Sequence, residues 1–268
     1  MKHMMKTICL LFFIGMVVLF SCKKEGQPVS QGVPQSVKDQ ISALGFTSTN
    51  VQKIDEGYLV EGDIIITPEL LSSSPQSLFL RVGNEEQYRT TNLVKSLPRT
   101  ITVSLDGRIP SAYGPVLDEM IRRYNALNLQ ISFQKVSSGG QINFKVAHGS
   151  YLASSGFPSS TGTPYPTVNV NTTAITQYSN SSTFLGFAAS IFAHEVGHCI
   201  GFRHTDYMNR AYSCGGSAVN EGASNVGAIL IPGTPSGPDP NSWMLACIGA
   251  GQNRPFNTND KTALNYLY

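Results

Sequence analysis

The sequence has few charged residues and no marked excess of either sign. Charged residues make up 13% of the 268 positions, and the formal net charge at pH 7 is +2 with both signs interspersed. Proteins that bind nucleic acids usually carry a clustered basic surface, so we expect no nucleic-acid partner. No internal repeat is present, and the length allows one full domain plus a smaller region.

The apolar run at the N-terminus, ICLLFFIGMVVLF at residues 8–20, is too short for a stable membrane span. Two lysines precede it and Ser21-Cys22 follows at once, which predicts a secretory signal peptide over residues 1–21. The last four residues of this region, Leu19-Phe20-Ser21-Cys22, resemble the bacterial lipobox, in which the cysteine is lipidated and becomes the mature N-terminus. The alternative is ordinary cleavage that leaves a free cysteine nearby.

A lipidated Cys22 predicts a membrane protein held only by its acyl chains. The next residue, Lys23, is not the aspartate associated with inner-membrane retention. We therefore expect a bacterial cell-envelope protein, an outer-membrane or surface lipoprotein.

Histidine is also scarce, but three of the five histidines lie within HEVGHCIGFRH at residues 194–204. His194 and His198 are four residues apart, so they lie one turn apart on the same face of a helix. Two imidazoles at this spacing can bind one metal ion at about 2.0–2.1 Å. Gly201 predicts the end of the helix, after which His204 can return as a third ligand. Three protein ligands and an open fourth position are typical of catalytic zinc, so we predict one catalytic Zn²⁺ at these histidines.

Glu195 follows the first histidine, about 100° further around the helix. It therefore lies beside the metal, where it can take a proton from an attacking water. A short HExxH arises by chance, and the alternative is a structural helix without metal. The longer HExxHxxGxxH fixes five positions, and Gly201 and His204 are needed only if a metal site is built.

The extended motif resembles that of the metzincin metallopeptidases, most of all their bacterial HEIGH-type branch. The run Gly201-Phe202-Arg203-His204 is similar to the astacin GFxH. The resemblance implies an α+β fold, with an upper twisted mixed sheet plus helices and an irregular lower subdomain. It also implies that Met244 forms the Met-turn beneath the zinc. Thr205 fits none of the best-known subfamilies, and Ala246 stands where astacins carry a zinc-binding tyrosine, so no tyrosine ligand is expected.

The same resemblance implies a zinc-dependent endopeptidase that hydrolyses internal peptide bonds of extracellular or periplasmic proteins. Zinc would activate a water, with Glu195 as the general base. Its expected partners are protein or peptide substrates, and we expect a monomer. A protein of a different class is the alternative, namely a surface lipoprotein that binds peptides or glycans on this scaffold without turnover. An intact Glu195 argues against it, because a binding module needs no base.

Five cysteines leave the disulfide pattern open. Cys9 leaves with the signal peptide and Cys22 is lipidated, so Cys199, Cys214 and Cys247 remain in a disulfide-permissive compartment. We favour a Cys214–Cys247 bridge, which would tie a long loop to the region after the Met-turn and contribute about 3–4 kcal/mol. Cys199 could instead pair with Cys247 or stay a small buried residue.

The chain divides into three expected parts. These are the signal peptide (1–21), a tether and prosegment (22–96) and the catalytic domain (97–268). Hydrophobic patterns predict strands near 57–67, 101–105, 129–133, 142–146 and 168–170, and helices near 37–44, 116–127, 183–200 and 258–268. The strand at 168–170 is our candidate for a sheet edge that pairs with an extended peptide, although an ordinary half-buried strand fits equally well.

Ahead of the catalytic domain, Val60-Glu61-Gly62-Asp63 resembles the FxGD motif of astacin prosegments. That resemblance implies that Asp63 binds the zinc in place of water and keeps the enzyme latent. The alternative is a plain turn leading into a strand. A latency segment would be removed by cleavage, which we place near Arg89 or Arg99, and its removal would also release the enzyme from its lipid anchor.

Overall fold

The computed structural model describes residues 32–72, 87–221, 227–235 and 238–268. The predicted signal peptide and the lipobox residue Cys22 lie outside these ranges. Among the helices of the described residues, none is both long and apolar enough to cross a membrane.

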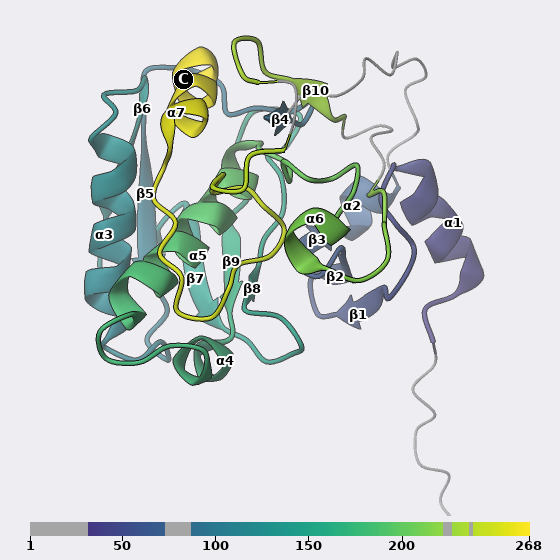
Figure 1. Cartoon of the computed structure of the whole chain (residues 1–268), viewed down its shortest axis with the longest axis horizontal. Coiled ribbons are helices and arrows are strands. Elements are labelled where there is room, and N and C mark those ends of the chain that lie inside the picture. The colour runs from purple at the N-terminus through teal and green to yellow at the C-terminus, as the bar shows by residue number, and fades with distance from the viewer. Residues whose placement is uncertain (1–31, 73–86, 222–226, 236–237) are drawn as a thin grey trace, which may run out of the picture. The chain divides into compact units, whose positions relative to one another are not determined.

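A five-stranded mixed sheet forms the centre of the molecule (Figure 1). Its strands are β5 (Arg99–Leu105), β6 (Ile131–Lys135), β7 (Ile142–Val146), β8 (Ala153–Ser154) and β9 (Thr167–Val170). The order is β6-β5-β7-β9-β8, and all neighbours are parallel except β8 and β9. The predicted edge at 168–170 is therefore wrong, because β9 lies inside the sheet. The edge strand next to β9 is β8, whose two residues are too few to show the alternating hydrophobic pattern of a strand.

Two long helices cover one face of this sheet, α3 (Tyr113–Asn125) and α5 (Phe184–Ile200). The buried residues of α3 recur every three or four positions, which turns one face of the helix to the core. Aromatic rings join the layers: Phe192 of α5 stacks on Phe144 of β7 at 4.4 Å, and Tyr124 of α3 contacts Phe133 of β6 at 4.9 Å. The α+β fold predicted from the sequence is confirmed.

The N-terminal segment forms a small three-stranded sheet with two short helices. Its elements are α1 (Gln35–Ala43), β1 (Gln52–Ile54), β2 (Gly57–Val60), β3 (Ile64–Ile66) and α2 (Pro68–Leu71). The single strand expected at 57–67 is thus a hairpin, with its turn at Glu61, Gly62 and Asp63. Alternation along β3 divides its side chains: Ile64 and Ile66 join a local cluster, whereas Ile65 enters the main core.

Several shorter elements complete the fold. These are α4 (Thr172–Gln177), α6 (Ala211–Cys214), α7 (Thr258–Leu267) and the pair β4 (Tyr88–Arg89) and β10 (Ile229–Leu230). The backbone of Arg203 donates to the carbonyl of Tyr88, and Tyr88 is buried. Strand β4 is therefore hydrogen-bonded to the histidine motif, although the sequence predicts that residues 22–96 are a tether and prosegment.

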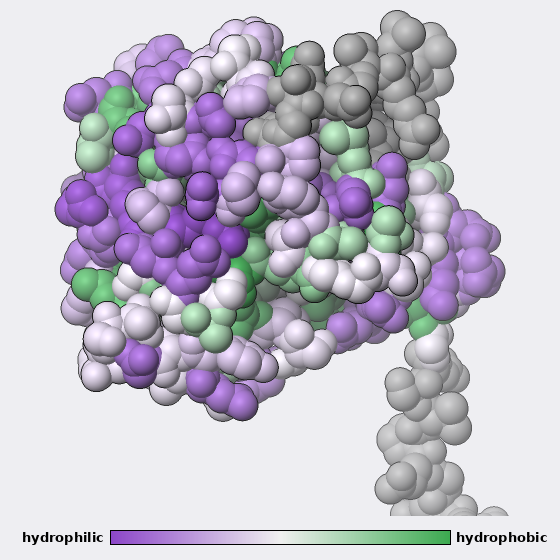
Figure 2. Space-filling view, viewed as in Figure 1, coloured by the Kyte–Doolittle hydropathy of each residue, from purple (hydrophilic) through white to green (hydrophobic). Residues whose placement is uncertain are grey.

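The surface has no large apolar patch on the face in view. Figure 2 shows hydrophilic side chains over the side on which α3 lies and apolar ones in small, separate areas. Among the described residues, the exposed large hydrophobic side chains are Tyr178, Leu185, Tyr212 and Tyr266.

Candidate metal centre and active site

Helix α5 carries His194 and His198 and ends where the sequence predicts. Gly201 has a φ of 117°, and its N–H donates to the carbonyls of Gly197 and His198. A side chain at Gly201 would also meet neighbouring chain, because its Cβ would lie 2.7 Å from Leu93 Cδ2. Glycine therefore serves both the left-handed turn and the close approach that brings the chain back toward His204.

The three histidines turn the same ring atom toward one point. Nε2 of His198 lies 3.1 Å from Nε2 of His194 and 3.2 Å from Nε2 of His204. All three side chains are buried or nearly so. Burial and the two neighbouring histidines lower the pKa of His198, so its ring is neutral, the form that binds a metal.

The other ring nitrogen, Nδ1, has an oxygen acceptor in each case. These acceptors are Trp243 O for His194 (2.9 Å), Phe202 O for His198 (2.8 Å) and the Glu221 carboxylate for His204 (3.0 Å). A carbonyl or carboxylate oxygen only accepts, so each Nδ1 carries a proton, and in the neutral, metal-binding form of each ring Nε2 presents a lone pair. Three lone pairs that face one another repel unless a cation lies between them.

These donor atoms fit zinc. Tetrahedral zinc at about 2.0–2.1 Å places its ligand atoms about 3.3–3.4 Å apart. Asp63 supplies a fourth atom, since its Oδ2 lies 3.1 Å from His204 Nε2 and 3.6 Å from His194 Nε2. These four distances are close to those that zinc requires, and all four donor atoms lie within 4.8 Å of one another, so the three histidines with Asp63 could hold the ion.

Asp63 interacts electrostatically with the three histidines. Burial would raise the pKa of Asp63, but His204 and His194 outweigh it and hold the pKa well below its ordinary value. Burial alone would lower the pKa of His204, and the carboxylates of Asp63 and Glu221 raise it instead. The Asp63 carboxylate is therefore ionised against the histidines, as a metal ligand must be.

Glu195 lies beside the three histidines and not among the converging atoms. Its Oε2 accepts a hydrogen bond from the Ser155 hydroxyl at 2.7 Å, and the side chain is buried. Burial and the Asp63 carboxylate raise the pKa of Glu195, while the Ser155 hydrogen bond lowers it. Ser155 follows the edge strand β8, so the sheet positions this carboxylate.

Met244 lies beneath the histidines in a buried turn. A Cβ on Gly197, in the middle of HEVGH, would lie 2.5 Å from Met244 Sδ, so this glycine makes room for the methionine. The carbonyl of Met244 accepts from the N–H of Thr205, directly after the third histidine. The Met-turn thus contacts both the helix and the returning chain.

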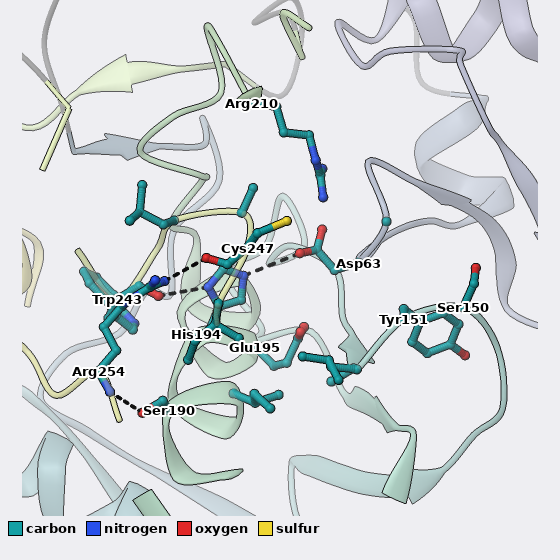
Figure 3. A pocket seen from close by; sticks show the side chains of 17 residues that line it. Asp63, Ser150, Tyr151, Ser190, His194, Glu195, Arg210, Trp243, Cys247 and Arg254 are labelled. Atoms are coloured by element: carbon teal, nitrogen blue, oxygen red, sulfur yellow. Dashed lines mark hydrogen bonds and ion pairs between the residues drawn. The ribbon is translucent and has the colours of Figure 1, made fainter. Parts of the chain in front are cut away.

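A cavity of about 230 Å³ opens beside His194 and Glu195 (Figure 3). The edge strand, α5 and the segment after Met244 all line it, with Asp63 projecting into it from the N-terminal segment. Such a cavity next to a base and a metal site can receive a side chain of a bound peptide.

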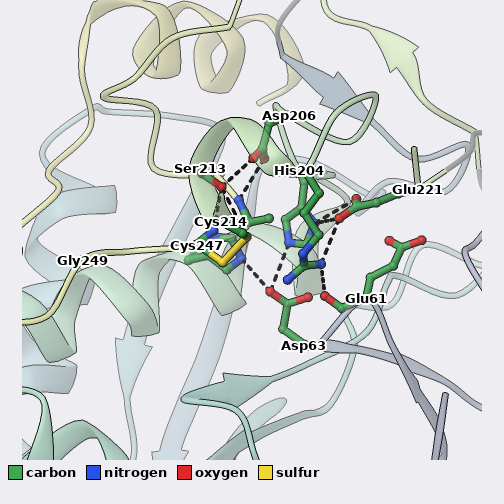
Figure 4. Close-up of a disulfide and its surroundings, with 12 residues drawn as sticks. Glu61, Asp63, His204, Asp206, Ser213, Cys214, Glu221, Cys247 and Gly249 are labelled. Atoms are coloured by element: carbon green, nitrogen blue, oxygen red, sulfur yellow. Dashed lines mark hydrogen bonds and ion pairs between the residues drawn. A yellow bond between two sulfur atoms is a disulfide. The ribbon is translucent and has the colours of Figure 1, made fainter. Parts of the chain in front are cut away.

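A disulfide joins Cys214 and Cys247 next to this cavity (Figure 4). The Ser213 hydroxyl, one residue earlier, accepts from the N–H of Cys247 and donates to Asp206. Together these links tie the chain after His204 to the cavity wall that follows the Met-turn. Cys199 is a free, buried residue of α5.

Sequence reasoning missed the polar residues around the motif. Ser155 contacts Glu195, and Glu221 contacts His204. Arg203 and Arg210 contact Glu61, in the turn that carries Asp63. Of these four residues only Arg203 lies within the motif. No local pattern marks the others, because they come from loops that the fold brings to the site.

The chain matches the profile of one protein family over residues 58–268, described as the dual-action HEIGH metallo-peptidases. It belongs to the HEIGH metallopeptidase family. The predicted metallopeptidase is thereby confirmed, and as a peptidase it acts on proteins or peptides. No curated protein matches the sequence.

Solved structures similar to this peptidase include two of myroilysin. The first has a TM-score of 0.41 and 20% sequence identity, and the match covers 66% of this chain and 95% of the myroilysin chain. The second has a TM-score of 0.39 and 17% identity, and the match covers 66% of this chain and 86% of the other. The high choriolytic enzyme 1 of the medaka fish Oryzias latipes, a hatching-enzyme zinc protease, has a TM-score of 0.33 and 16% identity, with 63% and 88% covered.

Proposed function

We propose that this peptidase is a zinc-dependent endopeptidase that hydrolyses internal peptide bonds of extracellular or periplasmic proteins. One observation carries the proposal: three Nε2 lone pairs converge at zinc-ligand distances while each Nδ1 proton is committed to an oxygen. His194, His198 and His204 would hold a single ion, and Met244 would pack against these histidines without being a ligand.

In the proposed mechanism, zinc supplies a Lewis acid that polarises the scissile carbonyl and makes water more acidic. Glu195 takes the proton of the attacking water and delivers it to the leaving amine. Ser155 holds one oxygen of Glu195, which leaves the other free to face the water. Burial of this carboxylate excludes competing water from its surroundings.

Substrate main chain pairs, in our proposal, with the edge of the sheet at Ser155. In the structure the N-terminal segment uses that position: Ile65 N–H donates to Ser155 O at 2.7 Å, and Ser155 N–H donates to Asp63 O at 2.8 Å. An extended peptide can make the same two hydrogen bonds once the segment has left.

We further propose that the N-terminal segment keeps the enzyme latent through Asp63. In support, Asp63 Oδ2 completes the donor set, and Ile64 pairs parallel with Ser155 on the substrate edge. Asp63→Ala in the full-length protein should raise peptidase activity without proteolysis, because water regains the fourth position. Asp55→Ala is the matched control, since it lies in the same segment but outside the donor set. Equal activity of uncut wild type and the Asp63 variant would exclude the latency role.

Glu195→Ala separates turnover from binding. We expect purified wild-type protein to cleave casein or gelatin after removal of the segment, and the variant to keep zinc but lose about 10²–10⁴-fold in rate. A chelator should abolish wild-type activity, and added zinc should restore it. If the two proteins behave alike, the peptidase is inactive and the peptide- or glycan-binding alternative is supported.

The envelope location remains a proposal from the sequence. We propose that Cys22 is acylated and anchors the protein to the membrane, with residues after it as a tether. Cys22→Ser should yield an unlipidated protein, which can be extracted without detergent. Native protein that is soluble and starts at another residue would contradict the anchor.

A further inference from the structure

Glu221 is a fully buried carboxylate, 17 residues after the third histidine, that nothing in the motif predicts. Both of its oxygens lie 3.0 Å from Nδ1 of His204. We propose that Glu221 is a positioning residue of the metal site, which fixes the ring and tautomer of His204 so that Nε2 faces the zinc. The inference rests on the proposed zinc-peptidase function and names a further residue of that site.

His204 needs such a partner because its place in the fold differs from that of the other two histidines. His194 and His198 stand on α5, and their Nδ1 protons go to backbone carbonyls that the fold holds in place. His204 lies after the helix end, on irregular chain. Its ring orientation is therefore set by a side chain, and the acceptor is charged, which makes the hydrogen bond stronger.

Glu221 is itself held firmly. Its N–H donates to Tyr207 O at 2.7 Å, which closes the loop between the two residues. Arg210 Nη1 lies 3.0 Å from Oε1 of Glu221, and Arg203 Nη2 lies 3.9 Å from Oε2. The buried carboxylate thus has cationic partners that balance its charge.

All these supports come from residues 203–221, within the catalytic part of the chain. Asp63 comes from the N-terminal segment, and so does Glu61, whose carboxylate also faces Arg203 at 3.5 Å. When that segment leaves, Glu221 keeps both arginines. It is therefore a permanent partner of His204, whereas Asp63 is a removable one.

A carboxylate that accepts the Nδ1 proton orients the imidazole and makes Nε2 a better donor to a metal. Loss of such a partner typically lowers metal affinity about 10–100-fold. Glu221→Gln keeps the shape and one acceptor oxygen but removes the charge. We expect zinc affinity of the full chain, measured by competition with a chelator of known affinity, to fall by about this factor.

Asp206→Asn is the matched control. Asp206 is another buried carboxylate of the same loop, but it accepts from Ala246 N–H and the Ser213 hydroxyl rather than from a histidine. Its substitution should leave zinc affinity within about threefold of wild type. Equal losses in both variants, or a Glu221→Gln affinity equal to wild type, would overturn the proposal. Wild type that binds no zinc would instead overturn the proposed function.

A second measurement needs no substitution and covers the case in which Glu221→Gln fails to fold. In zinc-loaded wild type with ¹⁵N-labelled histidine, nuclear magnetic resonance should show His204 protonated on Nδ1 and metal-bound through Nε2, with a slowly exchanging, low-field proton. A His204 ring bound through Nδ1 would contradict the assignment.

Discussion

Ser155 shows how one hydroxyl can matter to the base. Its Oγ lies 2.7 Å from Glu195 Oε2 and is buried with it. A hydrogen bond to a charged group contributes about 1.5–3 kcal/mol, so Ser155→Ala should lower kcat of the processed enzyme about tenfold or more. KM should change little, because the backbone that we propose to pair with substrate stays in place.

The neighbouring Ser154→Ala is the control for that measurement. Successive side chains of a strand point to opposite faces, so this buried hydroxyl faces away from Glu195. Steady-state kinetics of the two variants should differ. If both lose kcat equally, the effect belongs to the strand and not to the hydrogen bond.

Gly197 is a second residue whose size is fixed by its surroundings. An alanine there would bring Cβ to 2.5 Å from Met244 Sδ and 3.2 Å from Trp243 Nε1, both on buried side chains. Overpacking of this kind costs about 1–3 kcal/mol, so we expect urea to unfold Gly197→Ala at lower concentration. Gly107→Ala, where no atom lies within 4 Å, should unfold like wild type.

Asp260, a residue of the N-terminal capping box of helix α7, also hydrogen-bonds the Met-turn. Asn257 and Asp260 form a capping box, and Asp260 Oδ2 also accepts from Trp243 N–H at 3.2 Å. Burial raises the pKa of Asp260 from 3.8 to about 6, although its backbone hydrogen bonds oppose the shift. The folded state therefore prefers the protonated acid.

The sign of the pH effect follows from that raised pKa. The stability that protonated Asp260 contributes to the folded state is fully present below pH 3.8 and is lost as the pH rises to about 6. At 1.36 kcal/mol per pKa unit, the free energy of unfolding changes by about 3 kcal/mol. The free energy of unfolding of wild type minus that of Asp260→Asn should thus fall between pH 4 and pH 7. Urea titrations at both values measure it, and a difference that rises with pH would contradict this account.

Elements with a local signal could be predicted from the sequence, and the others could not. Helix α5 follows from the apolar run, the histidine spacing and Gly201, so its end is placed correctly. The β2–β3 hairpin looked like one strand, because Ile64, Ile65 and Ile66 continue the apolar run on both sides of a short turn. Strand β8 has only two residues, which are too few to show the alternating hydrophobic pattern of a strand. It is recognisable only from its pairing with β9.

The metal site shows the same division at the scale of the whole molecule. The histidines and Glu195 share eleven residues, so the motif alone predicts them. Asp63 comes from 131 residues before His194, and only a resemblance pointed to it. Ser155 and Glu221 carried no signal at all, because their roles arise where the sheet edge and a loop closed at Tyr207 meet the helix.

The boundary between the proposed latency segment and the catalytic part depends on contacts across the whole chain. Gln87 is buried, and its Nε2 donates to Asp260 at 2.8 Å and to the Ser242 hydroxyl at 3.1 Å. Thr90 N–H donates to Gly201 O at 2.7 Å. A cut at Arg89 would detach the contacts of Gln87 from the catalytic part, and a cut at Arg99 would detach those of Gln87 and Thr90.

A chain that starts at Gln87 should therefore fold and be active, whereas one that starts at Arg99 should melt at lower temperature. The longer form keeps β4 against β10 and the buried amide beside the Met-turn, while the shorter form leaves Asp260 and Ser242 without that donor. An unpartnered buried acceptor costs about 1–3 kcal/mol, and the lost burial of Tyr88 adds to it. Thermal unfolding and peptidase assays of the two forms decide the matter. Equal melting temperatures would return the boundary to residue 97 and leave Arg89 as an acceptable cleavage site.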